Sequence, residues 1–278
     1  MSAANGGTTP PEVVLVDVDD GVATVTLNRP ESRNAINRAM AQRLPVVLQE
    51  LEARDDVGAM ILTGADPAFC AGVDLKEFGR SGSAPGDVEG MDMGVRDADG
   101  RLPFRGPFPP RTKLLIGAVN GPAVTGGFEL ALGCDFLVAS ERARFADTHA
   151  RVGVIPGWGL TVMLCQSVGV RRARELSATG NYLGPEQALA WGLVNHVVPH
   201  DDLLPFTRAL ALGAVHNDRA AVSEMLRLYD EVAGATVDDG WEIEAAASRA
   251  WEGTGFDPAE IEARRAGVVE RGRSQVRG

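Results

Sequence analysis

The stretch AVNGPAVTGGFELALGCDFLVAS, residues 118–140, combines a strand, a glycine-rich turn, a helix and a second strand. The apolar run 114–119 predicts a buried strand, which ends before the Gly-Pro pair at 121–122. A helix is expected over 126–132, and a short apolar run predicts the next strand over 136–139. This alternation of strands and helices is typical of an α/β core.

The same alternation extends upstream. The β-branched runs 13–18 and 22–27 are joined by Asp-Asp-Gly, which predicts a hairpin. A helix is expected from about 37 to 53, with Pro45 in its first turns or at a kink, and a buried strand is expected over 57–63. Residues 79–111 are rich in Gly, Pro and Asp and are expected to form a loop. Within it, residues 104–110 are expected to belong to a loop on the substrate side of the site.

From about Trp158 onward the apolar residues follow a helical spacing. Four helices are predicted near the C-terminus, over 201–214, 218–232, 238–252 and 258–272. The predicted organisation is a disordered segment 1–11, an α/β core 12–200 and a helical region 201–278.

Composition narrows the classes of protein. The 278 residues suffice for one or two domains, and the net charge of −11 argues against nucleic acid or an anionic membrane as a partner. No apolar run approaches the length of a membrane span, and residues 1–12 lack the features of a secretion signal. Cys70, Cys134 and Cys165 lie in apolar contexts, so we expect reduced thiols and a cytoplasmic protein.

Several motifs of metal, nucleotide and redox enzymes are missing from the sequence. It contains no HExxH or CxxC spacing, no GxxxxGK[ST] phosphate loop, no GxSxG elbow and no GxGxxG after a strand. We therefore expect no metal site and no redox cofactor.

Two glycine-rich turns are the candidates for an active site. Residues 64–76 (GADPAFCAGVDLK) and 120–130 (NGPAVTGGFEL) each run from a strand end to a helix start, where backbone N–H groups are unpaired. Two such turns facing each other would point one N–H each at a single oxygen and stabilise the enolate of a thioester. Either turn taken alone is equally compatible with a purely structural role.

Taken with their flanks, these turns resemble the crotonase superfamily, the enoyl-CoA hydratase/isomerase family. Five stretches carry the resemblance, which spans about 12 to 272: 28–37 (NRPESRNAIN), 64–78, 118–140, 145–159 (FADTHARVGVIPGWG) and 180–198 (GNYLGPEQALAWGLVNHVV). The resemblance implies a crotonase-like spiral of repeated strand-strand-helix units with a helical C-terminal trimerisation region. It also implies a homotrimer or a dimer of trimers.

By position, the resemblance places the oxyanion hole at the backbone N–H groups of Val73 and Gly126. Positions that match the family's CoA and substrate pocket are Arg33, Ala35, Ala71, Asp74, Leu75, Lys76 and Gly127. Arg271 falls where the family often has a lysine that reaches CoA phosphates, although a solvated surface arginine is an equal alternative. CoA would arrive as part of the thioester substrate, with no separate cofactor.

Glu129 matches the first catalytic glutamate of the hydratases, which positions or deprotonates water. Without the resemblance, a glutamate in a first helical turn is favourable to the helix dipole and needs no catalytic role. The hydratases' second glutamate aligns with His149, a departure from the family pattern.

Histidine can donate or accept the α-carbon proton, and a nearby ionised Glu129 favours the imidazolium. We therefore predict that Glu129 handles water and His149 the α-carbon proton. The alternative is that His149 only shapes the acyl pocket. Asp147 could orient the imidazole, but an exposed loop aspartate is the simpler expectation. Four further residues are expected to be structural: Cys70, Trp158 (or a wall of the acyl pocket), His196 and His200.

The predicted function is hydration of a 2-trans-enoyl-CoA to a 3-hydroxyacyl-CoA in fatty-acid or related acyl-CoA breakdown. Two alternatives remain. One is a Δ3-Δ2-enoyl-CoA isomerase or other CoA-thioester enolate chemistry, since isomerases can shuttle a proton with one acid–base group. The other is a non-catalytic acyl-CoA-binding protein, which the substitution at position 149 favours and the retained Glu129 opposes.

Overall fold

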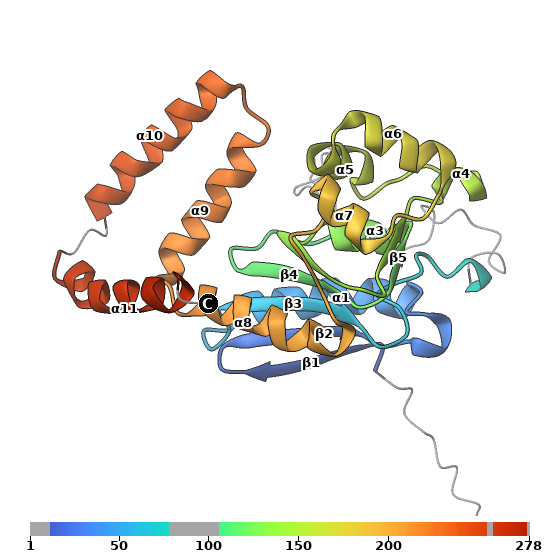
Figure 1. Ribbon diagram of the computed structural model, residues 1–278, viewed down its shortest axis with the longest axis horizontal. Coiled ribbons are helices and arrows are strands. Elements are labelled where there is room, and N and C mark those ends of the chain that lie inside the picture. Colours follow the sequence, from blue (N-terminus) through green and yellow to red (C-terminus); the bar gives the residue numbers. More distant parts are fainter. Residues whose placement is uncertain (1–11, 78–105, 255–257, 277–278) are drawn as a thin grey trace, which may run out of the picture. The chain divides into compact units, whose positions relative to one another are not determined.

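A computed structural model describes residues 12–77, 106–254 and 258–276. The disordered segment expected at 1–11 lies outside the described residues, as does most of the loop expected at 79–111. The described chain is a mixed α/β structure, in agreement with the predicted fold class (Figure 1).

Six strands form the main sheet, in the order β1-β2-β3-β4-β6-β8. Their bounds are β1 Val14–Asp19, β2 Val22–Leu27, β3 Ala59–Gly64, β4 Leu114–Val119, β6 Phe136–Ser140 and β8 His196–Val198. Strands β1 and β2 are antiparallel, and every later neighbour pair in this sheet is parallel. The predicted hairpin is confirmed: Asp20 and Gly21 both have positive φ, as the tight turn between β1 and β2 requires.

Helix α1 (Arg38–Glu52) connects β2 to β3. It begins where the side chain of Asn37 accepts a hydrogen bond from the Met40 N–H, and its apolar stripe is buried in the core. The helix continues through Pro45, which therefore lies in its interior and not in its first turns.

The second half of the chain adds a small sheet and a series of helices. Strands β5 (Pro122–Val124) and β7 (Arg144–Ala146) pair in parallel outside the main sheet. The helices are α3 Gly126–Leu132, α4 His149–Val152, α5 Leu160–Val168, α6 Val170–Thr179, α7 Pro185–Trp191, α8 Leu203–Val215, α9 Arg219–Val232, α10 Val237–Thr254 and α11 Pro258–Val276. Two 3-10 turns, η1 Pro30–Ser32 and η3 His200–Asp202, complete the order.

The strand-strand-helix rhythm is visible in this order. The units β1-β2-α1, β4-β5-α3 and β6-β7-α4 occur in this order along the chain, with β3 between the first two. In each of the last two units the second strand turns out of the main sheet into the β5–β7 pair. The spiral of such units that the resemblance implied is therefore present.

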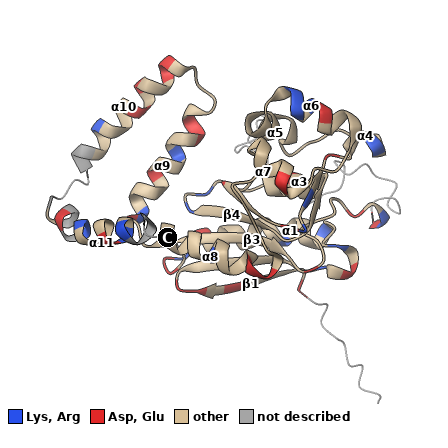
Figure 2. Ribbon diagram, in the orientation of Figure 1, with Lys and Arg blue, Asp and Glu red and all other residues tan. Residues whose placement is uncertain are grey.

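The main sheet is buried on both faces at its centre. Every residue of β3 and β4 is buried, and neither strand contains a charged residue, whereas edge strand β1 carries Asp17 and Asp19 (Figure 2). One face shares a hydrophobic cluster with α1, and α8 contacts β2, β3, β4 and β6.

The chain divides into two compact units, 1–223 and 224–278. Helix α8 belongs to the first, where Leu203, Thr207 and Ala211 are buried. The helical region predicted from 201 therefore begins with a helix that completes the α/β unit. Helices α10 and α11 lie in the second unit.

Candidate active site

The two glycine-rich turns lie against each other. The Cys70 N–H donates to Pro122 O at 3.0 Å, and the Val124 N–H donates to Cys70 O at 2.9 Å. A Cβ placed on Gly127 would lie 2.1 Å from Cys70 O, so this approach requires glycine. The sequence predicted that these turns could face each other, and the structure joins them by backbone hydrogen bonds.

This junction brings Val73 next to Gly126. A Cβ on Gly72 would lie 3.5 Å from the Gly126 nitrogen, and one on Gly126 would lie 3.6 Å from Cγ2 of Val73. Within the described residues, neither the Val73 N–H nor the Gly126 N–H donates a hydrogen bond. Two neighbouring unpaired donors can bind one oxygen that gains negative charge.

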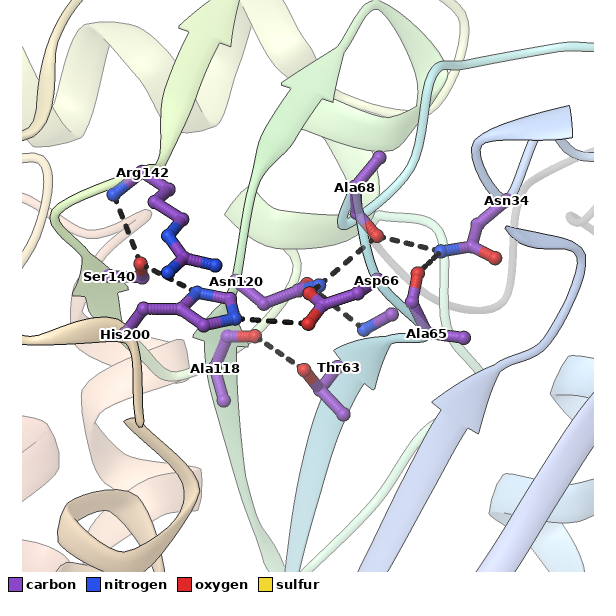
Figure 3. A network of polar contacts seen from close by, with 11 residues as sticks. Asn34, Thr63, Ala65, Asp66, Ala68, Ala118, Asn120, Ser140, Arg142 and His200 are labelled. Carbon is purple, nitrogen blue, oxygen red and sulfur yellow. Dashed lines mark hydrogen bonds and ion pairs between the residues drawn. The ribbon is translucent and has the colours of Figure 1, made fainter. Parts of the chain in front are cut away.

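A polar network holds the first turn in place (Figure 3). The Asn120 side chain accepts from the Gly64 N–H at 3.3 Å and donates to Asp66 at 2.9 Å and Ala68 O at 3.3 Å. The Asn34 amide adds donations to Ala65 O at 2.7 Å and Ala68 O at 2.6 Å. These bonds fix the backbone that leads into Val73.

His200 extends the network to the sheet. Its Nε2 lies 3.0 Å from Oδ2 of Asp66, and its Nδ1 lies 3.1 Å from Oγ of Ser140, at the end of β6 (Figure 3). His196 packs edge-on against Phe206, with ring centroids 5.0 Å apart. Both histidines therefore have the structural roles predicted for them.

Glu129 lies in the first turn of α3 and is 2% exposed. Its Oε1 accepts the Trp158 N–H at 2.7 Å and the Leu160 N–H at 3.3 Å. Burial raises the pKa of this carboxyl, while those two N–H donors and the nearby His149 act in the opposite direction. The second oxygen, Oε2, faces His149.

His149 is the first residue of α4 and is 7% exposed. Its Nε2 lies 3.6 Å from Oε2 of Glu129, and its Nδ1 lies 2.6 Å from Oδ1 of Asp147. A buried imidazole between two carboxylates can carry a proton to or from Glu129. The structure brings Glu129 and His149 together, as the predicted division of labour requires.

Asp147 corrects an expectation. It was expected to be an exposed loop residue, but it is 1% exposed and hydrogen-bonded to His149. Burial acts to raise its pKa, but hydrogen bonds from His149 and Ser177 hold the pKa below its ordinary value. Asp147 directly follows the short strand β7 and is hydrogen-bonded to Ser177 of α6, a contact that no periodicity in this segment indicates.

Thr125 joins the histidine segment to the second turn. Its Oγ1 lies 2.7 Å from Oγ1 of Thr148, and its N–H donates to Ala146 O at 2.9 Å. Thr125 has φ +54°, an uncommon backbone conformation for a β-branched residue. No pattern in the sequence indicated a role for Thr125, and only its place directly before the Gly-Gly pair could have suggested one.

Four of the residues predicted to contact CoA lie on two segments that are hydrogen-bonded to each other, and the others lie outside these contacts. The Ala71 N–H donates to Arg33 O at 3.0 Å, so the segments that contain Arg33 and Ala35 and those with Ala71 and Asp74 run side by side. The Asp74 carboxylate is held 3.0 Å from the Arg29 guanidinium. A salt bridge that the sequence did not indicate therefore occupies Asp74.

Leu75 and Lys76 are exposed beside this group, as is Arg33, and Gly127 is buried under Cys70. Arg271 is exposed on α11, in the second unit. Its predicted contact with CoA stays a prediction, as do those of the other residues in this set.

Two further residues match their structural expectations. Cys70 is fully buried, and burial raises the pKa of its thiol to about 12, so it is no nucleophile at neutral pH. Trp158 is partly buried against the core, and its ring comes within 3.0 Å of a Cβ placed on Gly126. It therefore packs on the core and also borders the second turn.

Among the described residues, no group of three or more His, Cys, Asp or Glu side chains is arranged to hold a metal ion. No helix in the described part of the chain is long and apolar enough to cross a membrane.

Comparison with known proteins places the chain in a family. A model of the enoyl-CoA hydratase/isomerase family matches residues 17–248. A probable peroxisomal enoyl-CoA hydratase of Arabidopsis thaliana is 39% identical over 202 residues, which cover 73% of this chain and 72% of that one. The 1,2-epoxyphenylacetyl-CoA isomerase of Escherichia coli is 38% identical over 200 residues, covering 72% and 75% of the two chains.

The fold comparison agrees. The crystal structure of an enoyl-CoA hydratase from Mycobacterium tuberculosis superposes with a TM-score of 0.70 at 47% identity, covering 85% of this chain and 98% of that one. The matching sequence, the spiral of strand-strand-helix units and the paired glycine-rich turns lead to one assignment. The chain belongs to the enoyl-CoA hydratase/isomerase family, the crotonase superfamily.

Proposed function

We propose that the protein adds water to a 2-trans-enoyl-CoA to form a 3-hydroxyacyl-CoA. The observation that carries this proposal is the buried Glu129–His149 pair, with Nε2 and Oε2 at 3.6 Å. Glu129 lies on the helix that begins at Gly126, and His149 directly follows Thr148, whose side chain is bonded to Thr125. The acid–base pair and the Gly126 donor thus lie on two segments that are joined by a hydrogen bond.

The backbone N–H groups of Val73 and Gly126 bind the thioester carbonyl oxygen in this proposal. As water attacks C3, the electron pair of the C2=C3 bond moves toward that oxygen and forms an enolate. Fixed backbone donors stabilise this charge without reorganising during the reaction. Neither donor is occupied within the described residues, which leaves both available to substrate.

Glu129 and His149 divide the proton transfers. Glu129 takes a proton from the attacking water, whose oxygen bonds to C3. The enolate then returns its electron pair to C2, which takes the proton on Nε2 of His149. Glu129 is left protonated and His149 neutral, and transfer of that proton across the 3.6 Å pair restores the starting state.

The same pair can also support isomerisation, the first alternative. A relative of this chain is named 1,2-epoxyphenylacetyl-CoA isomerase, and its match covers 72% of this chain. Isomerisation needs proton removal and return at two carbons but no water addition, so one shuttling group suffices. A non-catalytic acyl-CoA-binding protein would have no need to keep a buried carboxylate against an imidazole, which costs folding stability.

A spectrophotometric assay tests the proposal. Crotonyl-CoA and a medium-chain 2-enoyl-CoA are mixed with the wild type, His149→Ala and the control His216→Ala, whose histidine lies exposed at the end of α8. We expect the enoyl absorbance to fall with the wild type and the control, and roughly 100-fold more slowly with His149→Ala. Binding of these substrates without loss of absorbance would support the acyl-CoA-binding alternative. Conversion of a 3-enoyl-CoA instead would support the isomerase.

The CoA portion is proposed to bind along the paired segments that contain Arg33, Ala35, Ala71, Asp74, Leu75 and Lys76. Two cationic side chains in this set, Arg33 and Lys76, are exposed and can reach phosphates. Gly127 would serve the site by letting Cys70 lie close to the second turn, and Arg271 of a neighbouring subunit would add a further phosphate contact. No separate cofactor or metal is required by this chemistry.

The protein is further proposed to form a homotrimer or a dimer of trimers through its C-terminal helices. Large apolar side chains are exposed there: Met225, Tyr229, Val237, Trp241, Val268 and Val269. Such a concentration of apolar surface is typical of an interface between protein chains. A cytoplasmic role in acyl-CoA breakdown is consistent with three free cysteines.

A further inference from the structure

His149 has a second partner besides Glu129. Oδ1 of Asp147 lies 2.6 Å from Nδ1 of the imidazole and 3.2 Å from the backbone nitrogen of the same histidine. One carboxylate oxygen therefore binds both the ring and the main chain of His149. Asp147 is 1% exposed, so bulk water does not compete for that oxygen.

These contacts determine which ring nitrogen of His149 can exchange a proton with its surroundings. An ionised carboxylate can only accept hydrogen bonds, so Nδ1 must hold a proton where it meets Asp147. In the neutral imidazole, Nε2 is then the nitrogen without a proton. Nε2 is also the atom that faces Glu129, at 3.6 Å. All proton exchange of this side chain therefore passes through Nε2.

We propose that Asp147 is a positioning residue that holds His149 in the Nδ1–H tautomer and, through its charge, keeps the shared proton on His149 instead of Glu129. This inference rests on the proposed function, in which His149 must donate a proton while Glu129 accepts one. Without Asp147, the pair could exist as neutral Glu129 and neutral His149, which can neither activate water nor protonate C2. A buried carboxylate behind an imidazole has this orienting and charge-stabilising effect in other enzymes.

The surrounding groups support a role for Asp147 in particular. Glu129 faces the imidazole from α3, Asp147 faces it from the loop before α4, and Ser177 of α6 hydrogen-bonds to Asp147. The cation on α4, Arg151, binds Thr179 O and Asn181 and is directed to the end of α6. Among the described contacts, the two carboxylates are therefore the charged partners of the imidazole.

The first experiment measures the tautomer directly and needs no substrate. In ¹⁵N-labelled wild type, we expect the ring signals of His149 to show a protonated Nδ1 with a far-downfield proton. His149→Ala assigns the signals among the four histidines of the chain. In Asp147→Asn, the downfield proton should disappear. An Nε2–H tautomer in the wild type would overturn the proposal, even if the variant failed to fold.

The second experiment uses the pH profile of kcat/KM. Because His149 must be protonated to donate, activity is lost as pH rises and the imidazolium loses its proton. Removing the negative charge of Asp147 should move this alkaline limb to lower pH by about one unit or more, and lower kcat at least about tenfold with little change in KM. In a His149→Ala background, Asp147→Asn should have no further effect on kcat.

A matched control separates positioning from packing. Asp135→Asn removes the charge of another partly buried aspartate. Its carboxylate lies 2.6 Å from the Arg111 guanidinium and, among the described contacts, does not contact His149. This substitution should leave both the His149 signals and the pH limb unchanged. An unshifted limb together with an unchanged tautomer in Asp147→Asn would contradict the proposal. If the tautomer behaves as expected but no enoyl-CoA is hydrated, the proposed function fails while the role of Asp147 stands.

Discussion

Glu129 shows how a single buried carboxylate can combine catalytic use with a cost to the fold. It is 2% exposed, and two backbone N–H groups and one imidazole are its polar partners among the described contacts. Burial raises its pKa, which means that the ionised form is less stable in the folded chain than in water. At neutral pH this site therefore lowers the stability of the protein.

Replacing that carboxylate by an amide should separate activity from stability. In Glu129→Gln, the amide oxygen still accepts the Trp158 and Leu160 N–H groups, but the charge that must be desolvated is gone. We expect enoyl-CoA hydration to fall by about 10²–10⁴-fold, while Tm at neutral pH is no lower than that of the wild type. Parallel rate assays and thermal melts check this. A variant that melts several degrees lower would show that the charge itself stabilises the fold.

The raised pKa of Glu129 also predicts the acidic limb of the pH profile. Water activation requires the ionised carboxylate, so kcat/KM is full above its pKa and is lost as pH falls through it. Since burial raises the pKa, the limb should lie at higher pH than for an exposed glutamate. The pKa of Asp147 is lowered, so this aspartate loses its charge at lower pH than an ordinary aspartate does. Rates measured from pH 4 to 8 test this, and a limb near the ordinary glutamate value of about 4.3 would contradict it.

Among the elements, the turn between β3 and Val73 depends on side chains from distant strands. Asn120, at the end of β4, binds Gly64, Asp66 and Ala68, and His200 ties Asp66 to β6. The backbone donor at Val73 is therefore positioned by the ends of three parallel strands. This is the edge of the sheet at which α/β proteins place their binding sites.

Truncating Asn120 should loosen this turn. Its side chain belongs to a residue that is 5% exposed, and Asn120→Ala leaves the Gly64 N–H and Ala68 O without this partner. We expect a loss of about 1–3 kcal/mol in the free energy of unfolding, together with a lower kcat. Urea denaturation and rate assays measure both. Asn181→Ala, which removes an exposed amide, is the control and should change neither by much.

The periodicity of apolar residues does not predict the shortest elements. Strands β5 and β7 contain three residues each, too few to show an alternation of apolar and polar positions, and neither was predicted. By contrast, the predicted strand 114–119 and helix 126–132 match β4 and α3. Pro45 was expected in the first turns of α1 or at a kink; it lies in the helix interior, where six buried apolar residues along the stripe hold the helix together around it.

For the whole molecule, the second unit exposes apolar surface that a single chain leaves uncovered. Trp241 of α10 is 69% exposed and Tyr229 of α9 is 72% exposed. Burying such aromatic side chains between chains would contribute strongly to association.

Trp241→Glu tests the proposed oligomer. Light scattering should give three or six times the mass of one chain for the wild type, and the variant should shift toward the monomer at micromolar concentration. Tyr182→Glu, an exposed aromatic of the first unit, is the comparison and should leave the mass unchanged. A monomeric wild type would remove the basis for this assembly.

The sequence by itself determined the features that depend on local patterns. Apolar runs and hairpin residues predicted five of the six strands of the main sheet. The glycines of the two turns and Glu129 contributed to the resemblance to the family, and Glu129 with His149 formed the predicted catalytic pair. These features can be predicted from sequence because strand alternation, helix spacing and the need for glycine at close backbone contacts each involve only a few neighbouring residues.

Only the tertiary structure decided how distant groups combine. Asp66 and His200 are 134 positions apart, and their contact depends on where β6 and β8 place the chain. Asp147 was expected to be exposed, but it is 1% exposed and its carboxylate is hydrogen-bonded to His149 and to Ser177 of α6. Burial and the pairing of charges depend on which elements pack together, and no local pattern in this sequence contains that information.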